Sequence, residues 1–127
     1  MKKYLIQIKM CSDERRGRGV FATKFIGEGT EIEVADLYTF HHDSNVKKTG
    51  IDPYVYWFPN PEGDREMGAL GSGCAEFYNH SQKPNAQFFI DACCRKITYV
   101  ALKDIHKGDE ITIDYDMKLS FEELQGE

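Results

Sequence analysis

The sequence predicts a mostly β protein, and three features of the chain support this fold class. Apolar side chains alternate with polar ones at a period of two residues in several windows, which is the spacing of a half-buried strand. Turns rich in glycine, proline and aspartate separate these windows. No window has the apolar spacing of a long amphipathic helix, and 127 residues are enough for one ordinary domain.

Short segments along the chain are expected to form strands, because they alternate or are rich in β-branched and aromatic residues. In chain order they span residues 4–10, 20–22, 31–35, 37–40, 54–58, 88–90, 97–102 and 111–115. Residues 41–68 are the most polar and turn-rich part, so we expect a loop or an inserted segment there. An S-x-x-E capping box at Ser120 predicts a short C-terminal helix, and we expect any other helices to be short.

Charge and hydropathy limit the possible partners. Acidic residues outnumber basic ones by 21 to 16, a formal net charge of −5, which argues against direct nucleic-acid binding and favours a cationic partner. No stretch approaches the roughly 20 apolar residues of a membrane-spanning helix. Gln7 and Lys9 interrupt the apolar run that would make the N-terminus a signal peptide. We therefore expect a soluble, intracellular protein of the cytoplasm or nucleus.

The cysteines and histidines do not have the spacing of a metal site. Four cysteines occur without a C-x-x-C pair, namely Cys11, Cys74, Cys93 and Cys94, and the last two are adjacent. This pattern predicts neither a zinc cluster nor a secreted disulfide framework. We expect reduced thiols and no bound metal.

A glycine-rich motif, RGRGVFA, occupies residues 16–22. Gly17 and Gly19 allow the backbone to approach a ligand closely, because they carry no Cβ. The letters also match the G-x-G-x-x-A pattern of dinucleotide binding, but Gly27 and Gly29 follow too soon for the crossover helix that this pattern requires. A tight β-turn without a ligand is the other alternative.

Two further motifs carry polar groups suited to a site. Residues 77–85 read FYNHSQKPN, in which Asn79 and His80 can both hydrogen-bond a small ligand. Residues 107–116 read KGDEITIDYD, a turn and then a strand that delivers Tyr115 at its end. Taken singly, the first is also compatible with a structural turn before Pro84, and the second with a hairpin strand that buries its tyrosine.

In this order, the three motifs resemble the signature of SET-domain protein lysine methyltransferases. The resemblance spans residues 16–116, so we expect one SET domain over 1–127, with 117–127 a short C-terminal segment that lacks zinc-binding cysteines. YVYWFP at 54–59 and LGSG at 70–73 further resemble minimal single-domain members from bacteria and viruses. The resemblance implies a β-clip-like fold of several small sheets, with a pseudoknot-like threading of the C-terminal segment that brings the second and third motifs together.

The resemblance also implies an activity and a set of site residues. The methyl donor would be S-adenosyl-L-methionine, the product S-adenosyl-L-homocysteine, and the substrate a lysine of a basic protein such as a histone, with Tyr115 as the catalytic residue. The residues expected to bind the cofactor are Gly17, Arg18, Gly19, Tyr78, Asn79, His80 and Phe121. Those expected to line the substrate channel are Tyr54, Tyr56, Phe88 and Ile113, although the aromatic ones could equally be plain core.

This division of roles agrees with the chemistry of methyl transfer, which needs alignment and a neutral amine. Desolvation in an aromatic channel disfavours the ammonium form of lysine, and aromatic walls stabilise a methylated ammonium through cation–π attraction. Two other functions remain open at this point: a SET-like module that binds a protein partner without turnover, and a purely structural β domain. A homodimer that completes the substrate groove is also expected to be possible.

Overall fold

The structure is a computed structural model that describes residues 5–13, 17–41, 56–58, 67–91 and 93–115. These residues form strands and turns, with no helix among them, so the predicted mostly β fold is confirmed. The predicted helix at Ser120 lies outside the described residues. The strands are β1 (Ile6–Met10), β2 (Arg18–Ala22), β3 (Glu31–His41), β4 (Tyr56–Phe58), β5 (Met67–Gly71), β6 (Asn79–His80), β7 (Ala86–Asp91), β8 (Lys96–Ala101) and β9 (Glu110–Ile113).

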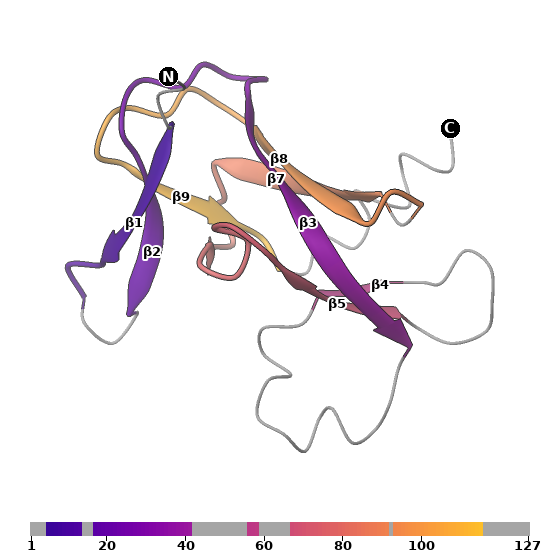
Figure 1. Ribbon diagram of the computed structural model, residues 1–127. Coiled ribbons are helices and arrows are strands. Elements are labelled where there is room, and N and C mark those ends of the chain that lie inside the picture. The colour runs from indigo at the N-terminus through magenta and orange to yellow at the C-terminus, as the bar shows by residue number, and fades with distance from the viewer. Residues whose placement is uncertain (1–4, 14–16, 42–55, 59–66, 92, 116–127) are drawn as a thin grey trace.

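The strands build two sheets, as Figure 1 shows. One has the order β1-β2-β9-β6 and the other the order β4-β5-β3-β8-β7. Every paired neighbour is antiparallel except β6 and β9, which run parallel. Parallel strands cannot be joined by a tight hairpin, so this pair brings together segments that are far apart in the sequence.

Strand β3 differs from its prediction in length and in the direction of its side chains. The two segments predicted at 31–35 and 37–40 form a single strand that pairs with β8 and then with β5. A register shift between Glu31 and Glu33 inserts one extra residue. Ile32 and Ala35 are therefore buried while Val34 is 45% exposed. Simple alternation over the predicted strand 31–35 would place Ile32 and Val34 on one face, and this is wrong because the bulge reverses the alternation.

Strand β5 was not predicted, and its first residues lie inside the segment expected to be a loop. Gly68 and Ala69 have a low β propensity, which explains why this segment carries no strand signal. The strand is stabilised by its two neighbours, since Ala69 pairs with both Thr39 of β3 and Tyr56 of β4 and is fully buried. Tertiary pairing has overridden local preference in this segment.

The core consists mainly of aliphatic and tyrosine side chains. The largest fully buried ones are Val20, Ile26, Tyr78, Ile97, Tyr99, Ile105, Ile111 and Ile113. Strand β1 contributes little to this core, because it lies at the edge of its sheet and pairs only with β2. The alternating residues Ile8 and Met10 of β1 are 36% and 58% exposed. Periodicity identified this strand but not the fact that it is an edge strand.

The segment that follows β6 is attached to β9 by side-chain and backbone hydrogen bonds. Nδ2 of Asn85 donates to the carbonyl of Glu110 at 2.8 Å, and its Oδ1 accepts from the amide of Thr112 at 2.9 Å. The amide of Ser81 donates to the carbonyl of Ile113 at 2.9 Å. The second and third motifs of the sequence are thus brought together, as the family resemblance implied.

We predict that Asn85→Ala destabilises the fold, because the variant loses both hydrogen bonds and leaves the amide of Thr112 without its partner. The free energy of unfolding should fall by about 1–3 kcal/mol in urea denaturation. Gln82→Ala, at an exposed position in the same segment, is the control and should change it by less than about 0.5 kcal/mol. Equal stabilities of the two variants would contradict this role of Asn85.

Candidate active site

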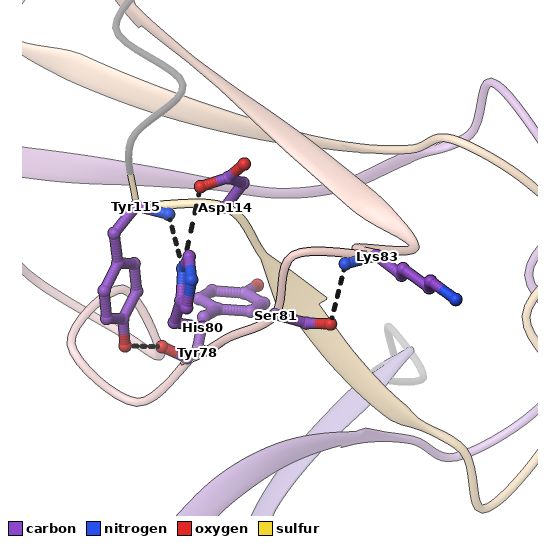
Figure 2. A network of polar contacts seen from close by, with 6 residues as sticks. All are labelled: Tyr78, His80, Ser81, Lys83, Asp114 and Tyr115. Carbon is purple, nitrogen blue, oxygen red and sulfur yellow. Dashed lines mark hydrogen bonds and ion pairs between the residues drawn. The ribbon is translucent and has the colours of Figure 1, made fainter.

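Tyr115 follows the end of β9 and is held at both ends, as Figure 2 shows. Its hydroxyl donates a hydrogen bond to the carbonyl of Tyr78 at 2.5 Å. Its amide donates to Nδ1 of His80 at 3.0 Å, and the two rings lie 5.1 Å apart between centroids. The residue is still 47% exposed, so Tyr115 lies at the surface of the described structure with its hydroxyl oriented by Tyr78.

The contacts of His80 define its tautomer. Nδ1 accepts from the amide of Tyr115, so a neutral ring carries its proton on Nε2. Oδ1 of Asp114 lies 3.7 Å from the same Nδ1. An ion pair with Asp114 would need a proton on Nδ1 and would displace the hydrogen bond from Tyr115. Figure 2 also shows Ser81, whose hydroxyl accepts from the amide of Lys83 and shapes the turn that follows.

Asn79 and Gly19 form a close contact between β6 and β2. Nδ2 of Asn79 lies 2.8 Å from Oε2 of Glu110, 3.2 Å from the carbonyl of Arg18 and 3.5 Å from Sγ of Cys11. A Cβ at Gly19 would collide with these same side chains of Glu110, Asn79 and Cys11. Glycine therefore allows these side chains to approach the backbone, and a larger residue would have to displace them.

The two residues on the N-terminal side of Gly19 have different surroundings. Gly17 has a φ of 68°, in the left-handed region, and a Cβ there would meet no atom within 4 Å. Arg18 is exposed, and its guanidinium lies 5.0 Å over the ring of Phe77, a cation–π contact. The glycine-rich motif thus combines an open turn, a surface cation and a closely packed backbone.

The side chain of Tyr78 lies in the core beneath Tyr115. It is 1% exposed, its ring stacks on Tyr99 at 4.0 Å, and its hydroxyl donates to Oε1 of Glu33 at 2.8 Å. Burial, followed by the charge of Glu33, raises the pKa of Tyr78. The carbonyl of Tyr78 reaches Tyr115, whereas its ring supports the site from below.

Two of the predicted channel residues, Tyr56 and Phe88, lie close to these tyrosines. The hydroxyl of Tyr56 donates to the carbonyl of Ala75 at 2.6 Å and lies 2.9 Å from the hydroxyl of Tyr99. The ring of Phe88 meets that of Tyr56 edge-on at 5.5 Å and is 7% exposed. Ile113 is fully buried. Tyr54 and Phe121, the remaining predicted site residues, lie outside the described part of the chain.

This geometry can be compared with that of known proteins. Residues 17–116 match the SET domain, which covers more than half of the chain. The chain belongs to the SET-domain family. The family predicted from the three motifs is therefore confirmed.

Several proteins similar to this SET domain are named as histone methyltransferases. It is 31% identical to the H3 lysine-37 specific histone-lysine N-methyltransferase of Schizosaccharomyces pombe, over 91% of this chain and 78% of that protein. It is 30% identical to the H3 lysine-9 specific enzyme of Neurospora crassa, over 77% of this chain but 34% of that protein. A solved Plasmodium falciparum structure, provisionally named a histone methyltransferase, is 28% identical with a TM-score of 0.63, covering 87% of this chain and 96% of that one.

The predicted enzyme class is confirmed by these comparisons. The family and the named relatives identify the chain as a SET-domain protein lysine methyltransferase. Enzymes of this family use S-adenosylmethionine as the methyl donor, so the predicted cofactor is supported at the level of the family. The roles of individual residues are taken up below as proposals.

Two carboxylates of this SET domain were not singled out as site residues by the sequence motifs. Glu33 lies just after the bulge of β3, and accepts from the hydroxyl of Tyr78 and, at 3.0 Å, from the amide of Cys74. Burial, and then Glu33, raises the pKa of the Cys74 thiol to about 11, so the thiol stays protonated. A signal for Glu33 could have come only from knowledge of the bulge, which directs its side chain inward.

Glu76 is the second of these carboxylates. Its Oε2 accepts from the amide of Gly71 at 2.6 Å. Burial raises the pKa of Glu76 to about 7, and the hydrogen bond from Gly71 only partly opposes this. Burial, followed by the charge of Glu76, in turn raises the pKa of Tyr115. An ionisable carboxyl therefore acts electrostatically on the tyrosine hydroxyl of the site.

Metal ligation and membrane insertion receive no support from the described part of the chain. Its His, Cys, Asp and Glu residues include no group of three or more placed to hold a metal ion. Cys11, Cys74, Cys93 and Cys94 form no disulfide with one another. No helix that could span a membrane occurs among the described residues. The expected absence of a metal remains a prediction.

We predict that Gly19→Ala damages the site, because the new Cβ would push apart Asn79 and Glu110. The variant should lose about 1–3 kcal/mol of unfolding free energy and bind S-adenosylmethionine at least about tenfold more weakly by calorimetry. Gly27→Ala is the control, since its Cβ would meet its nearest atoms at 3.7, 3.8 and 4.0 Å, which is ordinary contact. A Gly19→Ala variant that bound as tightly as the control would contradict the packing argument.

We also predict a pH-dependent stability that arises from Glu76. Because its pKa is about 7 in the folded chain and about 4.3 when unfolded, the folded state retains a proton that the unfolded state loses. The unfolding free energy should therefore fall as pH rises from about 4.5 to 7.5. Because Glu76 is only half-buried, we expect this fall to be about 1–2 kcal/mol larger in the parent than in Glu76→Gln.

Urea denaturation across this range measures the effect of Glu76 on stability. Glu28→Gln, at an exposed position, is the control and should show the same fall as the parent. If Glu76→Gln showed the parental fall as well, the carboxyl would have an ordinary pKa in the folded chain.

Proposed function

We propose that this SET domain transfers a methyl group from S-adenosyl-L-methionine to the lysine amine of a histone or another basic protein, releasing S-adenosyl-L-homocysteine. The observation that carries the proposal is the convergence of Asn79, His80 and the oriented hydroxyl of Tyr115 through the pairing of β6 with β9. The names of the relatives support a histone substrate. The net charge of −5 also favours a basic partner.

The cofactor-binding residues would be Gly17, Arg18, Gly19, Asn79 and His80, and their surroundings suit an elongated polar ligand. The ring of Tyr78, also predicted to bind the cofactor, is buried, so Tyr78 would take part through its backbone. Gly17 has open space where a Cβ would stand, so a ligand can approach the backbone there. Exposed Arg18 supplies a cation suited to a carboxylate group. When bound, the cofactor would supply an electrophilic methyl group on a sulfonium sulfur.

Tyr115 would orient the reacting amine through its hydroxyl oxygen. The hydroxyl proton is committed to the carbonyl of Tyr78, so the lone pairs of the oxygen are available to a substrate. Its raised pKa keeps the phenol neutral at pH 7. The stacked, hydrogen-bonded ring of Tyr78 holds that carbonyl in place. Orientation of this kind can supply much of the rate enhancement of a methyl transfer.

Tyr56 and Phe88 would contact the aliphatic part of the substrate lysine. The hydroxyl of Tyr56 bonds to the carbonyl of Ala75, and its burial raises its pKa, so it stays a neutral donor beside a wall of rings. A dry aromatic wall lowers the pKa of a substrate amine by desolvation. Ile113 would support this wall from the core. The roles of Tyr54 and Phe121, and the homodimer, remain predictions.

We predict that Tyr115→Phe abolishes most of the activity while the chain still folds. Transfer of labelled methyl groups from S-adenosylmethionine to recombinant core histones should fall at least about 100-fold in kcat. The cofactor Kd should stay within about threefold of the parent, because the ring and its backbone contacts are unchanged. Tyr38→Phe is a matched control, since Tyr38 lies on β3, is 75% exposed and should behave as the parent does.

The same experiment tests the alternative functions. Cofactor binding without label in the parent would favour a SET-like binding module over an enzyme. No cofactor binding at all would contradict the assignment of the glycine-rich and Asn79-His80 motifs to the cofactor.

A further inference from the structure

The turn between β5 and β6, residues 72–78, presents backbone carbonyls to tyrosine hydroxyls, and we call it the acceptor turn. The carbonyl of Ala75 accepts from Tyr56 at 2.6 Å, and the carbonyl of Tyr78 accepts from Tyr115 at 2.5 Å. Figure 2 shows the second of these bonds. Because the hydroxyl of Tyr115 donates to the last carbonyl of the turn, the position of the turn decides where that hydroxyl points.

Strand β3 holds the beginning of the acceptor turn. The amide of Ser72 donates to the carbonyl of Asp36 at 2.9 Å, and the amide of Asp36 donates to Oγ of Ser72 at 3.0 Å. Within the turn, the amide of Ala75 donates to the carbonyl of Ser72 at 3.1 Å. The amide of Phe77 donates to the carbonyl of Cys74 at 2.9 Å. These bonds shape the turn locally and attach its first residue to the sheet.

The carboxylate of Glu33, also on β3, holds the acceptor turn at two later points. Its Oε2 accepts from the amide of Cys74 at 3.0 Å, and its Oε1 accepts from the hydroxyl of Tyr78 at 2.8 Å. It also lies against the backbone of Gly73, where an added Cβ would come within 2.5 Å of Oε2. A carboxylate only accepts hydrogen bonds, and here each oxygen meets a donor. One side chain thus fixes the turn near its start and at its end.

The ring of Tyr78 transmits this constraint to its own carbonyl. The residue is 1% exposed, and its ring stacks on that of Tyr99 with the centroids 4.0 Å apart. The hydroxyl at the tip of the same ring is bound by Glu33. A side chain that is packed along its length and hydrogen-bonded at its tip leaves its backbone little freedom to move. A continuous series of contacts therefore runs from β3 to the hydroxyl of Tyr115.

We propose that Glu33 is a positioning residue for methyl transfer, which holds the acceptor turn so that the carbonyl of Tyr78 orients the hydroxyl of Tyr115. The inference rests on the role of Tyr115 in the lysine methyltransferase function proposed above. Glu33 acts through these two tyrosines and not by contact with the substrate or the cofactor. Because a misplacement of about 1 Å can cost about 100-fold in rate, loosening the acceptor turn should slow the reaction strongly.

A double-mutant cycle of Glu33→Ala with Tyr115→Phe tests the proposal, using the full chain, S-adenosylmethionine and recombinant core histones. Glu33→Ala loses both hydrogen bonds to the turn, so kcat should fall about 10- to 100-fold in the parent. In the Tyr115→Phe chain, which has no hydroxyl to orient, the same substitution should lower kcat less than about threefold. A merely structural role would lower kcat by the same factor in both chains.

Conservative variants test whether the hydrogen bonds carry the effect. Glu33→Gln can accept from Cys74 through its amide oxygen and donate to the hydroxyl oxygen of Tyr78 through its amide nitrogen. It should recover most of the lost kcat, to within about fivefold of the parent. Tyr78→Phe keeps the ring but loses the bond to Glu33, and should lower kcat about fivefold or more. Glu31→Ala, at an exposed glutamate of the same strand, is the matched control and should behave as the parent does.

Several results would overturn the proposal. They are equal losses from Glu33→Ala in both chains, a Glu33→Ala kcat within about threefold of the parent, and a Glu33→Gln variant as slow as Glu33→Ala. If Glu33→Ala does not unfold cooperatively in urea, Tyr78→Phe takes its place in the cycle, and a parental kcat in that variant contradicts the proposal.

Failures of the proposed function give different results. A Tyr115→Phe chain as active as the parent contradicts the role of Tyr115, and a parent that labels no lysine contradicts the methyltransferase function itself. In neither case does the outcome depend on a substitution at Glu33.

Discussion

The parallel pairing of β6 with β9 is the constraint on which the candidate site depends. Only Asn79 and His80 take part on one side, opposite Thr112 and Ile113. The pairing places His80 against the amide of a tyrosine 35 residues later and Asn79 against Glu110. Because so short a ladder supplies few hydrogen bonds of its own, the side chain of Asn85 and its bonds to β9 stabilise the arrangement.

Beneath this pairing lies a buried layer of polar aromatic residues. Tyr78, Tyr99 and Tyr56 are joined through ring stacking, shared carbonyl acceptors and the carboxylate of Glu33. No buried side-chain polar atom in the described residues lacks a hydrogen-bond partner. A fully satisfied network in a low-dielectric interior is rigid, which explains how the hydroxyl of a partly exposed tyrosine is oriented from below. Burial likewise raises the pKa of Glu76.

The strands and the site residues were predictable to different degrees. Enrichment in β-branched and aromatic residues located β2, β7 and β8. Alternation located β1 and β9, because successive side chains of a strand point to opposite faces. It failed at Ile32 and Val34, where a bulge adds one residue, and at β5, where pairing on both sides overrides weak propensity. Asn79, His80 and Tyr115 stood out as motif residues, whereas Glu33 and Glu76 lie outside the three motifs.

The sequence by itself determined the fold class, the family and the identity of the residues in the three motifs, because these depend on local spacing and on residue types at fixed separations. Only the tertiary structure decided that the ring of Tyr78 is buried while its carbonyl is presented to Tyr115. It also decided that the carboxyl of Glu76 is half-buried and accepts a hydrogen bond from the amide of Gly71. Burial and electrostatic environment depend on neighbours that are distant in the chain, so no local pattern records them.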